Sequence, residues 1–420
     1  MTPGTGRPFA FLMIAVLYMT QGIPLGLAME ALPGLLRQQG AALDRLAFLP
    51  LVGLPWVLKF LWAPLVDDRW SPRLGRRRSW VLPMQSLVLA TLLAVVATGV
   101  SETVSGWLVA GFALASLAGA TQDTATDGLA AEHFHGRDLA RANGIQVAGT
   151  MIGFFFGGSG TLVLAGLIGL TGALLVVAGV VAAGLVLALL WREGPILPGD
   201  APPRARASLK GFATRPGALP LLAVALLSAV TASAGFGLWK LFLIDAGWTI
   251  AAVGRLGIAA GAVTILLGCG GGAWMVARLG AWRALFVGLG ASGLAALIWA
   301  AQAAGLLPLT PGPSPLSLPF LAASLGAFGA GAASVAAMAL AMRFAAAAGQ
   351  AGTDMTSVQS TRDLGEIGTS SAITAFAAAA GYGGAFLAVT VAAGLTIAAV
   401  LHARRSAALR LAEAGLREMP

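Results

Sequence analysis

The chain has 420 residues, of which 58% are hydrophobic and only 10% are charged, and its mean hydropathy is +0.85. Soluble domains carry about 25% charged residues, so this chain cannot cover a surface that faces water. The net charge of +9 does not indicate nucleic-acid binding, because only three basic residues are lysines and the arginines lie mostly at the ends of apolar segments. The composition excludes an ordinary soluble protein and indicates an integral membrane protein.

A membrane-spanning helix needs about 20 mainly apolar residues, and twelve such segments follow one another along the chain. The expected spans are Phe9–Leu36, Leu46–Leu65, Trp80–Val100, Gly106–Ala131, Leu139–Leu162, Leu167–Leu190, Leu219–Ile244, Ala251–Met275, Ala284–Ala303, Leu316–Met342, Val358–Ala378 and Gly383–Leu401. A stretch rich in proline and arginine, residues 191–218, separates the sixth span from the seventh. We therefore expect an all-α polytopic membrane protein with two six-helix halves, at residues 1–190 and 219–401, and a tail at 402–420.

The basic residues predict which side of the membrane each connection faces. Arg37 and Arg45 are the two that fall in the expected external loops, whereas the connections on the other side hold most of the 26 Lys and Arg residues. Because cytoplasmic loops are enriched in Lys and Arg, both termini are expected in the cytoplasm. The first span is too long for the core of a signal peptide, and we expect it to remain in the membrane. The expected location is a bacterial cytoplasmic (inner) membrane.

Two short sequence patterns occur in both halves, which indicates that the halves are repeats. Arg73-Leu74-Gly75 followed by Arg78 recurs as Arg278-Leu279-Gly280 followed by Arg283, at the equivalent connection of each half. Gln146 and Gln359 lie early in the fifth span of their respective halves. Two parallel repeats of six helices predict a transporter with a central solute site.

A basic loop follows the second span and contains Asp68-Arg69 and then Gly75-Arg76-Arg77-Arg78. It resembles the cytoplasmic signature of the major facilitator superfamily, with a longer spacing between its two parts. A carboxylate and several guanidiniums that pair with helix ends in one conformation and release them in another would form a gate. The alternative is that the arginines only fix the topology.

A closer resemblance begins upstream of this loop. Lys59-Phe60-Leu61-Trp62-Ala63-Pro64-Leu65-Val66-Asp67 and Gln122-Asp123-Thr124-Ala125-Thr126-Asp127-Gly128 look like one branch of that superfamily, which contains the AmpG-type muropeptide permeases, the acetyl-coenzyme A transporters and siderophore importers of the rhizobactin and pyochelin type. Gln21-Gly22-Ile23-Pro24 and Gln350-Ala351-Gly352-Thr353-Asp354 extend the likeness to both halves.

The resemblance implies secondary transport of a bulky polar solute, with import driven by protons. The last of these motifs is more similar to the siderophore importers, so a siderophore is the first expectation for the solute. An anhydromuropeptide is the alternative, and a uniporter without proton coupling is another. Muropeptide permeases often carry extra helices after the twelfth, which this sequence does not show.

Three ionisable residues are expected inside the membrane of the first half. Asp123 and Asp127 are four residues apart and share a helix face, which should line the bundle interior or a water-filled path. Asp123 and Lys59 each lie about eight residues, or roughly 12 Å, from the cytoplasmic ends of their spans. One interpretation makes an aspartate the proton-coupling acid; the other makes Asp123 and Lys59 a static ion pair that packs two spans together.

The second half carries Arg362, Asp363 and Glu366 within its eleventh span. Arg362 and Glu366 are spaced to neutralise each other on one helix face. Alternatively, Arg362 binds an anionic group of the solute, such as a carboxylate, phosphate or catecholate. Glu30, Lys240 and Arg255 are expected near the outer ends of their spans, with side chains that reach the membrane surface.

Several carboxamides are further candidates for lining a solute cavity. They are Gln21, Gln122, Asn143, Gln146 and Gln359. Each could equally hydrogen-bond a neighbouring helix.

No other chemistry is expected. His133 and His135 lack partners spaced for a metal ion, the single Cys269 cannot form an intramolecular disulfide, and no nucleotide-binding Walker motif occurs. We therefore expect no metal, no cofactor and no enzymatic activity. The expected partners are a small-molecule solute and membrane lipid, and we expect a monomer.

Overall fold

The computed structural model describes residues 7–98, 106–134, 136–193, 209–233, 237–310, 317–346 and 351–405. These residues form helices and no strand; the one β-bridge among them is isolated and joins Ser71 to Gly75. Seven helical stretches within these ranges are long and apolar enough to cross a membrane. They are Pro8–Gln38, Arg78–Thr98, Ile145–Leu190, Ile250–Leu279, Ala281–Ala303, Leu318–Phe344 and Asp354–His402. The chain is therefore a polytopic membrane protein.

The contacts divide the chain into two compact units. Unit 1 comprises Met1–Pro202 and Leu243–Ile258, and unit 2 comprises Pro203–Phe242 and Ala259–Pro420. The short segment Leu243–Ile258 includes the end of the seventh expected span and the start of the eighth, yet it packs with the first half of the chain.

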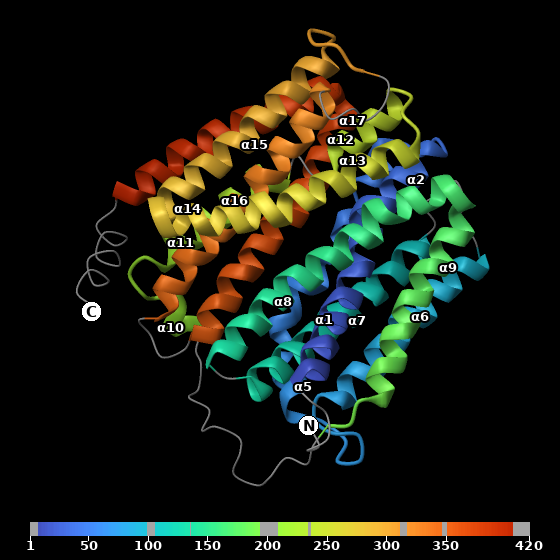
Figure 1. Ribbon diagram of the computed structural model, residues 1–420. Coiled ribbons are helices and arrows are strands. Elements are labelled where there is room, and N and C mark those ends of the chain that lie inside the picture. Colours follow the sequence, from blue (N-terminus) through green and yellow to red (C-terminus); the bar gives the residue numbers. More distant parts are fainter. Residues whose placement is uncertain are drawn as a thin grey trace. The chain divides into compact units, whose positions relative to one another are not determined.

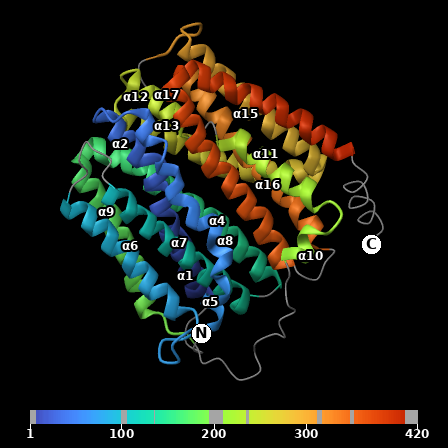
Figure 2. The same ribbon diagram turned by 180° about the vertical axis from the view of Figure 1, so that it is seen from behind.

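Unit 1 begins with a long first span that is helical throughout. It consists of α1 (Arg7–Gly26), a π-helical segment η1 (Leu27–Ala31) and α2 (Leu32–Gln38). The later helices are α6 (Arg78–Thr98), α7 (Gly106–His133), α8 (Gly136–Phe155), the π-helical η4 (Phe156–Gly160) and α9 (Thr161–Leu190). The helix α1 packs against both α7 and α8, which surround it in Figures 1 and 2.

The second expected span is not one continuous helix. It is a series of short pieces, α3 (Leu43–Leu46), η2 (Leu49–Gly53), α4 (Leu54–Leu58), η3 (Lys59–Leu61) and α5 (Ala63–Asp68), of which η2 and η3 are 3₁₀-helical. Pro50, Pro55 and Pro64 each stand at the first or second position of a piece. Because proline lacks a backbone N–H and clashes with the preceding turn, it ends one piece and starts the next.

Two helical stretches are much longer than a single span requires. Ile145–Leu190 has 46 residues and Asp354–His402 has 49, and each contains one glycine with non-helical backbone angles. These are Gly169 (φ 78°) in α9 and Gly381 (φ 72°) in α17 (Ala351–Arg405). Positive φ is readily adopted only by glycine. Gly381 lies between two predicted spans, whereas Gly169 lies two residues after the predicted start of the sixth span.

Unit 2 contains the remaining helices. They are α10 (Leu209–Ala213), α11 (Ala218–Ser233), α12 (Leu238–Asp245), α13 (Ile250–Val263), the π-helical η5 (Thr264–Gly271), α14 (Gly272–Leu279), α15 (Ala281–Ala303), α16 (Leu318–Ala346) and α17, with parts of α12 and α13 assigned to unit 1. Trp239, Phe242, Trp299 and Phe386 form a buried aromatic cluster, in which the rings of Trp239 and Trp299 stack with centroids 5.8 Å apart.

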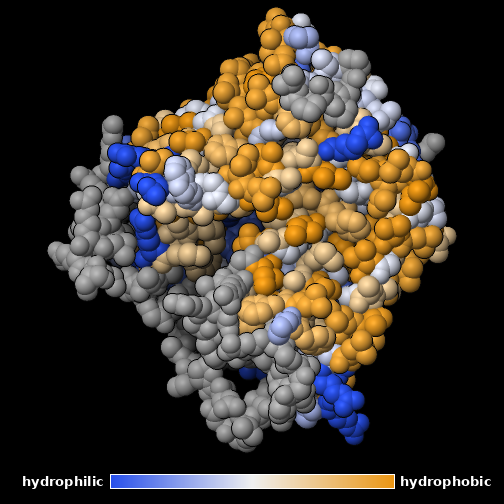
Figure 3. Space-filling view, viewed as in Figure 1, coloured by the Kyte–Doolittle hydropathy of each residue, from blue (hydrophilic) through white to orange (hydrophobic). Residues whose placement is uncertain are grey.

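Hydrophobic side chains cover most of the described surface on the face that Figure 3 shows. Leu190, Leu219 and Leu395 are each at least 66% exposed, on helices of both units. Contiguous exposed apolar surface of this kind is rare on soluble monomers and is what lipid requires.

Inside unit 1, α1 and α8 approach so closely that a Cβ on Gly153 would overlap the carbonyl oxygen of Met19.

Candidate functional site

Asp123 lies at the centre of a buried polar group in unit 1. Its Oδ2 accepts a hydrogen bond of 2.5 Å from Nζ of Lys59, and its Oδ1 accepts one of 2.5 Å from Nε2 of Gln21. All three residues are buried, and they come from α7, η3 and α1. The matched depth of Asp123 and Lys59 in the sequence therefore corresponds to a direct ion pair.

Asp127, one helical turn further along α7, has a different set of partners. Its Oδ1 accepts hydrogen bonds from the hydroxyl of Tyr18 at 2.8 Å and from Nε2 of Gln146 at 2.7 Å. Asp123, Lys59 and Arg77 lie within electrostatic range of its carboxyl group. Both direct donors are neutral, so the charge of this carboxylate is balanced only from a distance.

Local structure explains how Lys59 reaches Asp123. The residue lies in η3, at the point where the proline-broken chain between Leu54 and Asp68 tightens into a 3₁₀ turn. Its ammonium group also lies 5.4 Å from the ring centroid of Trp56, within cation–π range. Trp62 donates its indole N–H to Thr121 at 3.1 Å, which fixes this segment against α7. The irregular backbone of the second span therefore places Lys59 where its ammonium group reaches Asp123.

Sequence reasoning missed Tyr18, and it placed Gln122 with the cavity candidates. Tyr18 is fully buried in α1. Gln122 is also fully buried, but it donates to the backbone carbonyl of Leu17 at 3.3 Å rather than to either aspartate. In the described structure, Oε1 of Gln21 and Oε1 of Gln122 accept no hydrogen bond. The signal for Tyr18 was its rarity: the chain has only two tyrosines.

The basic loop after the second span is attached to the end of α9 through Glu193. The carboxylate of Glu193 accepts the backbone N–H groups of Arg77 and Arg78 at 2.9 Å, at the start of α6. The guanidinium of Arg78 donates in turn to the carbonyl oxygens of Ala188 and Leu189. A carboxylate at a helix N-terminus satisfies free N–H groups and interacts favourably with the helix dipole. Sequence analysis did not single out Glu193.

The other residues of this loop take varied positions. Gly75 has φ 99°, and a Cβ there would lie 2.5 Å from the Glu193 carboxylate, so only glycine fits. Arg77 is buried and its guanidinium packs against Gly128 of α7. Arg69 is exposed and accepts the Trp80 indole N–H at its backbone carbonyl, whereas Arg76 is half-buried. The side chain of Asp68 lies outside the described residues.

Unit 2 has its own polar cluster on α17. The guanidinium of Arg362 donates one hydrogen bond to Oγ of Ser334 on α16 and another to Oε1 of Glu366. Gln359, one turn earlier on α17, is exposed, and Asp363 is half-buried. The predicted pairing of Arg362 with Glu366 is therefore present, with a serine contact that the sequence did not indicate.

A second ion pair in unit 2 joins Arg215 to Asp354. Asp354 is 1% exposed, and Arg215 also donates to the carbonyl oxygen of Phe344 and stacks on its ring with a distance of 3.9 Å to the centroid. The sequence analysis assigned Arg215 to the central polar stretch and gave it no partner. Its position just before α11 shows that it anchors the start of this helix to α16 and α17.

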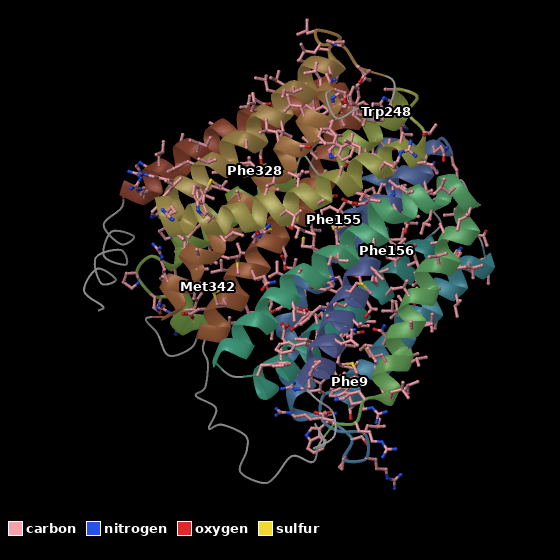
Figure 4. All side chains as sticks on the ribbon, viewed as in Figure 1. Phe9, Phe155, Phe156, Trp248, Phe328 and Met342 are labelled. Atoms are coloured by element: carbon pink, nitrogen blue, oxygen red, sulfur yellow. The ribbon has the colours of Figure 1, made fainter. Side chains whose placement is uncertain are left out.

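Two charged residues expected to reach the membrane surface are buried instead. Glu30 is 3% exposed and accepts a 2.9 Å hydrogen bond from Ser159, and Lys240 is 2% exposed. Glu30 lies in η1 and Ser159 in η4, so two π-helical segments meet at this point (η4 begins beside the labelled Phe155 and Phe156 in Figure 4). Of the three residues, Arg255 is the exposed one.

Within the described residues, no group of three or more His, Cys, Asp or Glu side chains is placed to hold a metal ion. The side chains of His133, His135 and Asn143 lie outside the described part of the chain. Cys269 is half-buried in η5.

Comparison with known proteins finds a family model that matches within unit 1 and relatives that match larger or smaller parts of the chain. A family model described as acetyl-coenzyme A transporter 1 matches residues 10–166. The anhydromuropeptide permease of Escherichia coli is 28% identical over 285 residues, which is 65% of this chain and 57% of the permease. An uncharacterized membrane protein of Saccharomyces cerevisiae is 31% identical over 171 residues, and an uncharacterized protein of Schizosaccharomyces pombe is 33% identical over 152 residues.

The matches cover only parts of these relatives. They span 30% of the budding yeast protein and 28% of the fission yeast protein, and 34% of this chain in each case. The region matched by the family model contains Tyr18, Gln21, Lys59, Asp123, Asp127 and Gln146, which together form the polar group around the two aspartates. The match to the acetyl-coenzyme A transporter family model therefore includes the part of the chain that builds this site.

Proposed function

We propose that this protein is a proton-coupled secondary transporter that imports a bulky polar solute, with Asp127 as the residue that carries the proton. One observation carries the proposal: Asp127 lies in α7, which the sequence predicts to be the fourth span, and its carboxylate has two neutral hydrogen-bond donors, Tyr18 and Gln146. A carboxyl group in such surroundings can exist in both protonation states, because a hydroxyl and a carboxamide can each turn to accept as well as donate.

Asp123 has the structural role in this proposal. It is bound directly to Lys59 and Gln21, and removal of its charge would take the ion-pair partner away from a buried ammonium group. Asp123 therefore acts as the partner of Lys59 and holds the second span against α7. The electrostatic coupling between Asp123 and Asp127 makes the protonation of Asp127 sensitive to any movement of Lys59.

The proposal includes the twelve-span arrangement in two six-helix halves of the major facilitator type, in the cytoplasmic membrane of a bacterium with both termini in the cytoplasm. It is supported by seven spanning stretches, two of which are long enough for two spans each and contain a glycine break. In this scheme the loop held by Glu193 is a cytoplasmic gate, because it ties α6 to α9 through contacts that can be broken one by one.

For the solute, an anhydromuropeptide is the first candidate to test, because the similar Escherichia coli protein is named an anhydromuropeptide permease. A siderophore remains a prediction from the sequence motifs, since none of the relatives described above is named as a siderophore importer. A uniporter for either solute is the alternative to proton coupling.

The test is uptake into proteoliposomes that contain the purified full chain, with and without an imposed pH gradient. We expect an anhydromuropeptide to accumulate only with the gradient. Asp127→Asn should abolish accumulation but retain exchange of labelled for unlabelled solute, whereas Asp44→Asn, at an exposed carboxylate of unit 1, should behave as the wild type. Undiminished gradient-driven accumulation by Asp127→Asn would overturn the proton-carrier assignment. Equilibration without accumulation by the wild type would establish the uniporter.

A further inference from the structure

The cluster around Arg362 lies on α17, within a helical stretch that is long and apolar enough to cross a membrane. This stretch runs from Asp354 to His402, and its helix is interrupted at Gly381. Arg362 and Glu366 both lie before the interruption, in the part that the sequence predicts to be the eleventh span.

The polar side chains of this segment share one face of α17. Gln359, Arg362, Asp363 and Glu366 have the spacing of one helical stripe, and their side chains are half-buried or exposed. The opposite face packs inside unit 2, where a Cβ on Gly365 would lie 2.9 Å from the carbonyl oxygen of Leu226 in α11. Ionisable side chains that face lipid are costly, so the polar face must line a water-filled path.

The guanidinium of Arg362 is held on two sides by groups of different kinds. Ser334 of α16 fixes one terminal nitrogen with a neutral acceptor, and Glu366 binds the other terminal nitrogen with a carboxylate oxygen. The side chain of Arg362 is 17% exposed and that of Glu366 is 33% exposed. Because Glu366 is only partly buried on this polar face, its carboxylate can leave the guanidinium at a smaller cost than a fully buried one could.

The wall beside this cluster is irregular in structure. The π-helical segment η5 packs on α16, with Gly268 against Gly331 and the carbonyl oxygen of Phe328, which Figure 4 labels. Cys269 of η5 lies close enough to Arg362 to interact with its charge. Short π-helical segments within α-helices occur frequently at functional sites, which favours a role for this cluster beyond packing.

We propose that Arg362 is the receptor for an anionic group of the transported solute, and that Glu366 competes with that group for the guanidinium. The solute class is then a carboxylate-bearing one, bound through the planar fork that guanidinium offers to a carboxylate. Ser334 positions the guanidinium in both states, and Glu366 occupies it when no solute is bound. This inference rests on the proposed function in so far as the bound solute is the one that is transported.

A competing Glu366 and a static ion pair predict opposite effects of Glu366→Gln on solute affinity. If the pair only stabilises α17, neutralising either partner disturbs the same contact, and Arg362→Gln and Glu366→Gln weaken solute binding together. If Glu366 competes with the solute, Glu366→Gln removes the competitor and strengthens binding, while Arg362→Gln removes the receptor and weakens it.

The experiment measures dissociation constants for the purified full chain in detergent, with no gradient present. The probes are an anhydromuropeptide with free carboxylates and its methyl ester. We expect the acid to bind at least about tenfold more tightly than the ester to the wild type. Arg362→Gln should bring the acid to the level of the ester, and Glu366→Gln should tighten the acid severalfold while leaving the ester unchanged. Arg343→Gln, which removes an exposed guanidinium at the end of α16, is the control and should bind like the wild type.

Arg362→Lys keeps the proposal testable if Arg362→Gln does not fold, because lysine keeps the positive charge but lacks the planar fork. We expect this variant to bind the acid with an affinity between those of the wild type and Arg362→Gln. Equal binding of acid and ester, no binding of either to the wild type, or weakening of the acid by Glu366→Gln would overturn the proposal. Binding without gradient-driven accumulation in proteoliposomes would instead overturn the proton coupling and leave the anion site standing.

Discussion

Tyr18 donates a hydrogen bond of 2.8 Å to Oδ1 of Asp127, although the two residues are 109 positions apart in the chain. The tyrosine ring is fully buried against the core of unit 1, so the hydroxyl has a fixed direction. One helical turn away on α7, Asp123 is instead held by Lys59. Two aspartates on one helix therefore have different chemical surroundings, one beside neutral donors and one beside an ammonium group.

The first prediction concerns the hydroxyl of Tyr18. Tyr18→Phe removes one of the two direct donors to Asp127 and keeps the ring that packs in the core. We expect a severalfold loss of gradient-driven accumulation with a fall in stability of about 1.5–3 kcal/mol, the usual value of a hydrogen bond to a charged group. Uptake and thermal unfolding measure the two effects. Tyr382→Phe changes the other tyrosine of the chain, in unit 2, and serves as the control; an equal loss of accumulation in this variant would contradict the prediction.

The second prediction tests whether Lys59 and Asp123 stabilise the protein as an ion pair. Lys59→Met or Asp123→Leu alone breaks a buried ion pair by removing one partner and should destabilise the protein by about 3–5 kcal/mol. The double variant removes both charges, and we expect it to recover most of the lost stability while transport stays impaired. Thermal unfolding of the four proteins gives the coupling directly. Additive losses in the double variant would show that the two residues do not act as a pair.

The third prediction tests the carboxylate that ties the basic loop to α9. Glu193→Gln weakens the interaction with the start of α6, because a neutral carboxamide is a poorer acceptor than a carboxylate for the N–H groups of Arg77 and Arg78. We expect a loss of about 1 kcal/mol and faster labelling of a cysteine introduced at Arg76. Arg192→Gln alters the exposed neighbour of Glu193 and should leave the labelling rate unchanged. Unchanged labelling in Glu193→Gln would contradict the proposed gate contact.

The fourth prediction concerns the pair of Arg37 and Asp245, which attaches the segment Leu243–Ile258 within unit 1. Nε and a terminal nitrogen of Arg37 donate to the two carboxylate oxygens of Asp245 at 2.7 and 2.6 Å. Both side chains are about one quarter exposed, at 23% and 26%. A double-mutant cycle with alanine should give a coupling of about 0.2–1 kcal/mol that shrinks as salt is raised. A coupling that does not respond to salt would show that the pair is not screened by water.

The fifth prediction tests the close approach of α1 and α8. A Cβ on Gly153 would overlap the backbone carbonyl of Met19, which cannot move aside as a side chain can. We therefore expect Gly153→Ala to lower the stability by more than 1 kcal/mol, within the range of about 1–3 kcal/mol for overpacking. Gly179→Ala is the matched control in α9, because no atom lies within 4 Å of its Cβ position. In this control the higher helix propensity of alanine should be neutral or slightly stabilising.

Composition and hydropathy were sufficient to predict the class of the protein and the approximate limits of its helices. The long apolar stretches follow from residue type, and the i,i+4 spacing allowed the pairing of Arg362 with Glu366 to be predicted. The pairing of Asp123 with Lys59 was one of two interpretations, and the structure contains this ion pair. The prediction of a continuous helix for the second span was wrong. It was based on apolar content, which does not show that three prolines divide the segment into short helical pieces.

Other features depend on which side chains meet across distant parts of the chain. Tyr18 reaches Asp127, Glu193 reaches the start of α6, and Arg215 reaches Asp354, each over a separation of more than 100 residues. Glu30 and Lys240, expected at the membrane surface, are buried because other helices pack over them.

The sequence by itself determined that this protein is embedded in a membrane, because the ratio of apolar to charged residues fixes the solvent in which a chain can fold. It also determined which residues are too costly to face lipid. Only the tertiary structure decided which of these residues became partners, because a hydrogen bond needs both groups within about 3 Å and that distance is set by helix packing. The different surroundings of Asp123 and Asp127, four residues apart on one helix, are the result of that packing.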